Sequence, residues 1–196
     1  AGAETEMGYA GDMTSTIPAD ATYTTRQKEI YDIVIASHEA SIKELRPGVT
    51  FESVYDTSAK VIVEGLKSLG FMRGDAAEAV KAGAHALFYP HGLGHMMGLD
   101  VHDMENLGEI YVGHNGQPKS TQFGRKSLRL GRMLEPGFVH TIEPGIYFIP
   151  ELIDLWRSER KFEEFINYEK VVTYKDFGGI RNEADYLITP TGSRLL

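Results

Sequence analysis

The stretch YPHGLGHMMGLDVHD, residues 89–103, brings His91, His95 and His102 into a twelve-residue window. The whole chain has 7 histidines in 196 residues, so an even distribution would place fewer than one of them there. Glycines in the same window disfavour a helix, which excludes the helical metal motif in which two histidines flank a glutamate. These glycines are at positions 92, 94 and 98.

In an extended segment, alternate residues share a face, so His91, Leu93 and His95 are expected on one face. One interpretation is a set of partly buried histidines that bond to the backbone. Three histidines together, with Asp100 and Asp103 adjacent, favour a functional site instead.

A second candidate is Glu143, inside the apolar stretch FVHTIEPGIYF at 138–148. An ionised glutamate is costly to bury unless it is paired, protonated or bound to a metal. A surface strand with Glu143 turned outward is the alternative. Apolar residues on both faces favour a strand that is covered on both sides. They are Phe138 and Ile142 on one face and Val139 and Tyr147 on the other.

The third candidate is GGIRNEADYLIT at 178–189, where alternation places Arg181, Glu183 and Asp185 on one face. A ladder of surface ion pairs would explain this pattern equally well. Asp12 adds a carboxylate from the alternating segment at 8–17, and by itself it carries no weight.

Taken together, Asp12, His95, Glu143 and Glu183 supply carboxylate oxygens and one imidazole from separate expected strands. Such ligands suit manganese, iron, cobalt or zinc in a carboxylate-bridged pair better than a lone structural zinc. The chain has no cysteine, which removes every thiolate site and every cysteine nucleophile.

The 196 residues predict one α+β unit spanning 1–196, without an internal repeat or a linker. Hydrophobic periodicity and end signals predict helices at 25–45, 50–69, 75–84 and about 150–166. Strands are expected at 8–17, 139–148 and 179–189. We interpret the polar segment 104–133 as a functional or mobile loop, because long connections without structure are otherwise uncommon.

The net charge of −8 argues against nucleic acid and anionic lipid as partners, because both are recognised through basic patches. No apolar run is long enough for a membrane span, so we expect a soluble chain. The lack of cysteine fits a reducing compartment, and we expect a cytoplasmic protein. The chain starts at Ala1 without an initiator methionine, so an upstream signal peptide or domain stays open.

Three motifs, in this order, resemble the pita-bread metallopeptidases, the family of Xaa-Pro aminopeptidase and Xaa-Pro dipeptidase (prolidase). They are HGLGH with GLDVHD (His91 to Asp103), TIEPGIYF (Thr141 to Phe148) and GGIRNEADYLIT (Gly178 to Thr189). GYAGDMTST around Asp12 also resembles a segment of this family, so the resemblance covers the chain. It implies a pita-bread fold with a curved, mostly antiparallel sheet, helices on its outer face and a truncated N-terminus.

The resemblance also implies two divalent metal ions, with manganese preferred over cobalt, zinc or iron. Asp12 and Glu183 would bridge the ions, and His95 and Glu143 would complete the coordination of one of them. A bridging water or hydroxide would attack the scissile carbonyl. A further ligand aspartate precedes Ala-Gly in the family, and here the chain begins at Ala1, so we expect weak binding or a single metal.

Further roles follow from the same resemblance. His91 and His102 match outer histidines that contact substrate and the developing oxyanion, and Glu143 would be the proton shuttle. Arg181 would hold a ligand carboxylate. Arg129 matches an arginine with which prolidases bind the free carboxylate of a dipeptide. A solvated loop charge explains Arg129 equally well.

The sequence departs from the family pattern at Asn182 and Ala184, where an aliphatic residue and an acid are usual. Glu183 between them is retained. We expect a metal-dependent exopeptidase that acts on peptides with proline at the second position, with a dipeptide slightly favoured over longer peptides. The alternatives are a non-catalytic domain of this fold that binds peptides or proteins, and an inactive fragment. A homodimer is left open.

Overall fold

The computed structural model describes residues 2–196, and its main sheet is built around the long strand β6. β6 (Gly178–Ile188) pairs along one edge with β4 (Val139–Ile142) and β5 (Gly145–Phe148), and along the other with β3 (Thr14–Ser15) and β7 (Ser193–Leu195). Every one of these pairings is antiparallel. One strand therefore aligns segments from both ends of the described chain.

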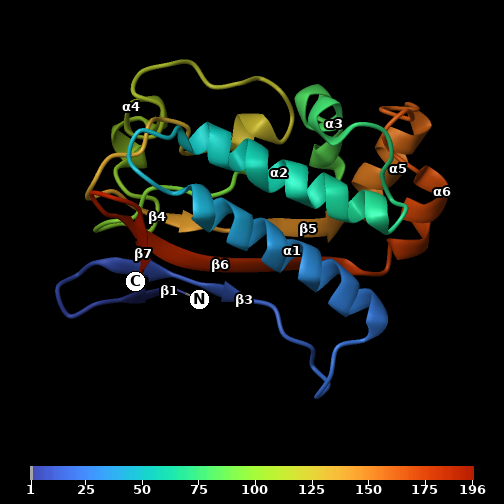
Figure 1. The fold of residues 1–196 in the computed structure, drawn as a ribbon, viewed down its shortest axis with the longest axis horizontal. Coiled ribbons are helices and arrows are strands. Elements are labelled where there is room, and N and C mark those ends of the chain that lie inside the picture. The colour runs from blue at the N-terminus through green and yellow to red at the C-terminus, as the bar shows by residue number, and fades with distance from the viewer. Residues whose placement is uncertain (1) are drawn as a thin grey trace.

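Two helices cover one face of this sheet (Figure 1). α1 (Thr25–Glu44) lies on the sheet, and α2 (Phe51–Ser68) packs alongside α1. Both helices begin after a threonine cap. Threonine is suited to this position because its side-chain oxygen accepts a backbone N–H group of the first turn. Thr24 accepts from the Gln27 N–H in a capping box, and Thr50 accepts from the Ser53 N–H.

The remaining helices are short. They are α3 (Ala76–Ala82), α4 (Glu109–Val112), α5 (Pro150–Ser158) and α6 (Tyr168–Val171). Single 3₁₀ turns occupy Ala84–Leu87, Glu105–Leu107, Arg125–Ser127 and Val172–Tyr174. The segment 104–133, which we interpreted as a loop, thus holds only brief helical turns.

A separate two-stranded hairpin precedes the main sheet. β1 (Gly2–Glu4) pairs antiparallel with β2 (Ala10–Asp12), and Asp12 is the last residue of β2. The alternating pattern predicted one strand at 8–17. The structure instead divides this segment at Met13, so that β2 and β3 belong to different sheets.

Two further expectations need correction. Glu143 lies between β4 and β5 rather than inside one strand, because Pro144 lacks the N–H group that a ladder needs. The helix expected at 150–166 ends at Ser158. Beyond it, Arg160 and Phe162 adopt positive φ angles of 53° and 54°, which a right-handed helix does not allow.

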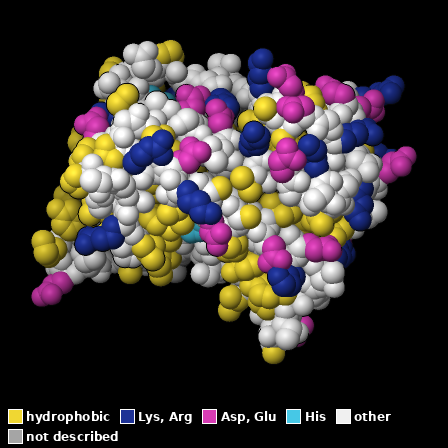
Figure 2. Space-filling view, viewed as in Figure 1, with side chains coloured by type: hydrophobic (Ala, Val, Ile, Leu, Met, Phe, Trp, Pro, Cys, Tyr) yellow, Lys and Arg dark blue, Asp and Glu magenta, His cyan; other side chains and the backbone are white. Residues whose placement is uncertain are grey.

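The hydrophobic core lies between the sheet and the helices. Large side chains such as Phe51, Tyr55, Phe71 and Phe88 are completely buried there. On the outer face, acidic and basic side chains are interspersed over the two long helices (Figure 2). No helix within residues 2–196 combines the length and the apolar character that a membrane crossing requires.

Candidate metal centre

Three predicted ligands meet where the hairpin, the main sheet and the histidine-rich segment come together. Asp12, His95 and Glu183 each offer one ligand atom, and these atoms all lie within 4.8 Å of one another. Asp12 ends β2, and Glu183 lies in β6. The three residues are far apart in sequence, so the fold itself creates this cluster.

His95 is placed by an extended segment that runs beside β4. The Thr141 N–H donates to the His95 carbonyl at 3.0 Å, and the Glu143 N–H donates to the Leu93 carbonyl at 2.7 Å. This approach is close enough that a side chain at Gly94 would collide with the Thr141 carbonyl, at 2.2 Å from its Cβ. Leu93, between the two histidines, is completely buried in the hydrophobic core.

The His95 ring presents one free nitrogen to the carboxylates. Its Nδ1 lies 3.1 Å from the Met96 carbonyl, which can only accept, so Nδ1 carries the hydrogen of the neutral ring. The Nε2 lone pair then faces Asp12 Oδ2 at 3.7 Å and Glu143 Oε1 at 3.6 Å. Histidines that bind metals characteristically donate their other N–H to such a carbonyl.

Glu143 is buried beside its neighbours of like charge. Arg181 Nη1 donates to Glu143 Oε2 at 2.9 Å. Burial, with repulsion from Glu183 and Asp12, still outweighs this ion pair and raises the pKa of Glu143 to about 7. A cation at this point would offset the repulsion among the carboxylates.

Glu183 is held from β3. Thr14 is its partner in the β3–β6 register, and the Thr14 hydroxyl donates to Glu183 Oε2. The Glu183 side chain is buried, so this hydroxyl replaces part of the hydration that the carboxylate lost. The other face of β6 carries Asn182, whose side-chain amide donates to Nδ1 of His38 in α1 at 2.7 Å.

A cavity of about 410 Å³ opens beside these residues. Its wall includes five predicted site residues besides Glu143, while Asp12 and Glu183 adjoin it through their contacts with His95. These five are His91, His95, His102, Arg129 and Arg181.

His91 and His102 flank the cavity in different environments. His91 Nδ1 donates to the Gly92 carbonyl, so Nε2 accepts from the Tyr147 hydroxyl at 3.1 Å. Burial lowers the pKa of His91 to about 4, which keeps the ring neutral near pH 7. The His102 ring lies 4.3 Å from that of His95, centre to centre, and its pKa is lowered by burial and then by His95 and Arg129.

The segment 104–133 contributes charged residues to the same wall. Arg129 lies there, and its guanidinium is ion-paired with Glu105. Glu109 and Lys119 line the cavity as a second ion pair, and the sequence did not indicate them. Nothing in their local sequence separates them from ordinary loop charges. Tyr147 was also missed as a contact of His91, although it lies in a quoted motif.

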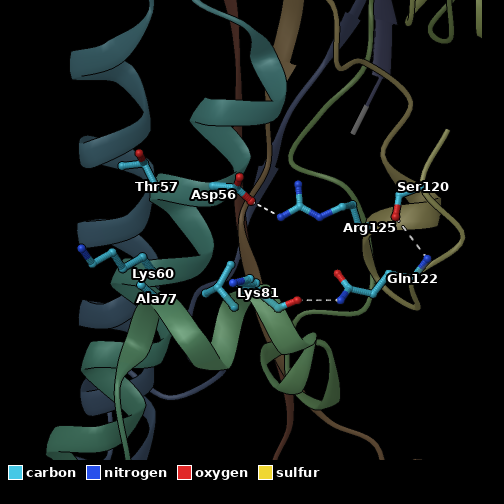
Figure 3. A pocket seen from close by; sticks show the side chains of 9 residues that line it. Asp56, Thr57, Lys60, Ala77, Lys81, Ser120, Gln122 and Arg125 are labelled. Atoms are coloured by element: carbon cyan, nitrogen blue, oxygen red, sulfur yellow. Dashed lines mark hydrogen bonds and ion pairs between the residues drawn. The ribbon is translucent and has the colours of Figure 1, made fainter. Parts of the chain in front are cut away.

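A different hollow, of about 560 Å³, lies between α2, α3 and the segment 120–125 (Figure 3). Arg125 and Asp56 in its wall form an ion pair. None of the predicted site residues lines this hollow. The chemistry of the candidate centre is therefore confined to the cavity beside His95.

The residues present fit a divalent metal. The donors are three carboxylates and one imidazole whose free nitrogen faces two of them, a combination suited to manganese, iron, cobalt or zinc. Without a cation, Asp12, Glu143 and Glu183 repel one another, and this repulsion adds to the effect of burial in raising the pKa of Glu143.

Comparison with known proteins agrees with this chemistry. The chain is 36% identical to human Xaa-Pro dipeptidase over 188 residues, which cover 96% of this chain and 37% of the human protein. It is 38% identical over 185 residues to a probable Xaa-Pro aminopeptidase of Botryotinia fuckeliana, covering 94% of this chain and 38% of that protein. The chain thus spans well under half the length of these curated relatives.

Solved structures of aminopeptidase P are also similar to this chain. An Escherichia coli aminopeptidase P variant in complex with substrate superposes with a TM-score of 0.70 at 37% identity, covering 96% of this chain and 34% of that one. The mixed fold with its antiparallel sheet is the pita-bread fold, as the resemblance implied. The model of metallopeptidase family M24 matches residues 1–190, so the chain belongs to this family.

Proposed function

We propose that this protein is a metal-dependent exopeptidase that hydrolyses the N-terminal Xaa-Pro bond of short peptides. The observation that carries the proposal is the position of His95. Its Nε2 faces the carboxylates of Asp12 and Glu143, while its Nδ1–H is engaged by a backbone carbonyl. The names of the similar proteins, Xaa-Pro dipeptidase and Xaa-Pro aminopeptidase, support the choice of substrate.

Asp12, His95, Glu143 and Glu183 would hold the metal, and we propose two divalent ions, preferably manganese. When bound, such ions lower the pKa of a water molecule and polarise the scissile carbonyl. A zinc-substituted aminopeptidase P of Escherichia coli in complex with product is among the similar structures, at 38% identity.

The remaining residues of the cavity would bind substrate and move protons. Glu143 would accept a proton from the attacking water and deliver it to the leaving proline nitrogen. His102 would donate a hydrogen bond to the substrate or to the developing oxyanion. His91 would contact the substrate through Nε2, because its Nδ1–H is engaged by the Gly92 carbonyl. Arg181 orients Glu143 through their ion pair.

Arg129 would bind the free carboxylate of a dipeptide. Its planar guanidinium suits a bidentate contact, and it lines the cavity. In the structure it is paired with Glu105, so a substrate carboxylate has to replace or share this partner. Binding of the free carboxylate by Arg129 would favour dipeptides over longer peptides.

The test is release of free proline from Ala-Pro by the manganese-loaded protein, compared with its His95→Ala variant. We expect turnover that the substitution reduces by at least about a thousandfold, the order seen when a group at the reacting centre is lost. Peptide binding without proline release would favour the alternative, a binding domain of this fold. Equal release by both proteins would exclude His95 from the site.

A further inference from the structure

The hairpin that carries Asp12 is a sheet of its own, separate from the sheet that carries Glu183. Two backbone N–H groups of β2 point away from β1 and towards other parts of the protein. The Ala10 N–H donates to the Gly98 carbonyl at 2.9 Å. The Asp12 N–H donates to Oδ2 of Asp185 in β6 at 3.0 Å.

Asp185 is two residues beyond Glu183 in β6, so both side chains project from the same face of the strand. The residue is only 9% exposed. Burying a carboxylate is costly unless hydrogen bonds compensate, and Oδ1 of Asp185 is buried without a hydrogen-bond partner within the described chain. Asp185 is therefore an acid at an unfavourable place, where its other oxygen accepts from the backbone N–H of Asp12, a predicted ligand.

We propose that Asp185 is a positioning residue that fixes Asp12 for metal binding. The proposal rests on the proposed function, because it concerns the same metal centre. Asp12 and Glu183 must approach within a few ångströms although they belong to different sheets. The hydrogen bond from Asp12 to Asp185 joins those sheets at the ligand itself, and it links Asp12 to the strand of Glu183.

Asp185 is not itself assigned as a ligand. The cluster of converging ligand atoms contains Asp12, His95 and Glu183 but not Asp185. The Asp185 oxygen nearest to Asp12 is already engaged by the backbone N–H. Its effect on the metal therefore acts through the position of Asp12, as outer partners of metal ligands commonly do.

The experiment is calorimetric titration of the chain with Mn²⁺, comparing Asp185→Ala and Asp185→Asn. The asparagine side chain is isosteric with aspartate and retains a carbonyl oxygen that can accept from the Asp12 N–H, whereas alanine cannot. We expect D185A to weaken Mn²⁺ binding by about ten- to a hundredfold. We expect D185N to stay within about threefold of the parent. The matched control is D154A, which removes an exposed aspartate paired with Lys175 and should leave affinity unchanged.

A second measurement does not depend on folding of the variants or on metal. Amide hydrogen exchange of the unsubstituted chain should show the Asp12 N–H protected at least about tenfold relative to an unstructured peptide. The proposal is overturned if this amide exchanges at the unstructured rate, if D185A binds Mn²⁺ as tightly as the parent, or if D185N loses as much affinity as D185A. Failure of the parent to bind Mn²⁺, with Asp12 protected, would instead contradict the proposed function.

Discussion

Arg181 Nη1 lies 2.9 Å from Oε2 of Glu143, and this ion pair joins the strand of Glu183 to the residue that follows β4. Arg181 is 39% exposed at its side chain and Glu143 only 12%. The pair therefore stabilises the charged form of a carboxylate that burial and its neighbours disfavour. This relationship makes Arg181 the residue that keeps Glu143 available to a cation.

Replacing Arg181 by alanine should weaken Mn²⁺ binding at pH 7 by about tenfold. Without the guanidinium, the pKa of Glu143 rises further, so protons compete more strongly with the metal. The loss should become smaller at pH 8.5, where Glu143 is ionised in both proteins. Calorimetric titration at the two pH values checks this, with R181K as the matched variant that retains the charge. An equal loss at both pH values would mean that Arg181 acts on the shape of the site.

Glu143 should make the metal-free protein less stable as pH rises. The pKa of Glu143 is raised from 4.5 in the unfolded chain to about 7 in the folded protein. Its contribution to the free energy of unfolding is therefore complete below pH 4.5 and is lost as the pH rises through 7. Between pH 6.5 and 8 the loss of stability amounts to roughly 1 kcal/mol. Buried histidines such as His91 and His140, with pKa values lowered to about 4, change stability in the opposite direction.

The comparison of Glu143→Gln with the parent isolates this contribution, because both proteins share the histidines. Urea unfolding at pH 6.5 and 8 should show the parent losing about 1 kcal/mol relative to E143Q across this range. Parallel changes in the two proteins would contradict the raised pKa of Glu143.

His38 should stabilise the packing of α1 against β6, on the face of the strand opposite to Glu183. It accepts from Asn182 at Nδ1, 2.7 Å away, and its Nε2 lies 3.3 Å from the Tyr186 hydroxyl. His38→Leu leaves both partners without this contact and should cost about 1–3 kcal/mol in urea unfolding. Tyr186→Phe removes only the longer contact and should cost about 0.5–1.5 kcal/mol. A smaller cost for H38L than for Y186F would show that the histidine is not the centre of this network.

Arg129 should set the length of the substrate. If it binds the carboxylate of a dipeptide, Arg129→Ala removes a charge-assisted pair worth roughly 1.5–3 kcal/mol, or about ten- to a hundredfold in kcat/KM. An Xaa-Pro tripeptide should be little affected, because its carboxylate lies one residue further on. Arg157→Ala, an exposed arginine of α5, is the control. Equal losses on both substrates would assign Arg129 to the structure of the loop.

Local signals in the sequence predicted the elements that depend on local chemistry. A helix was expected to begin at residue 50, and there the Thr50 hydroxyl accepts the Ser53 N–H. β1 and β7 were missed because each has three residues, which is too short for alternation to be visible. The break at Met13 was missed because the division between two sheets is decided by pairing with distant strands.

In the candidate site too, residues in local motifs could be predicted, whereas contacts between distant segments could not. Asp12, His95 and Glu183 could be named because each lies in a recognisable motif, and the structure places their ligand atoms together. The contact between Asp12 and Asp185 could not be predicted, because it depends on how two segments 173 residues apart are aligned. Glu109 and Lys119 belong to an irregular segment in which no period relates a residue to the cavity.

The most direct test of the metal centre is a crystal structure of the chain soaked in Mn²⁺, with anomalous diffraction used to locate the ion. We expect an anomalous peak within about 2.0–2.6 Å of His95 Nε2 and of carboxylate oxygens from Asp12, Glu143 or Glu183. A saturating soak that gives no peak at this cluster, or a peak only at exposed carboxylates elsewhere, would contradict the proposed metal centre.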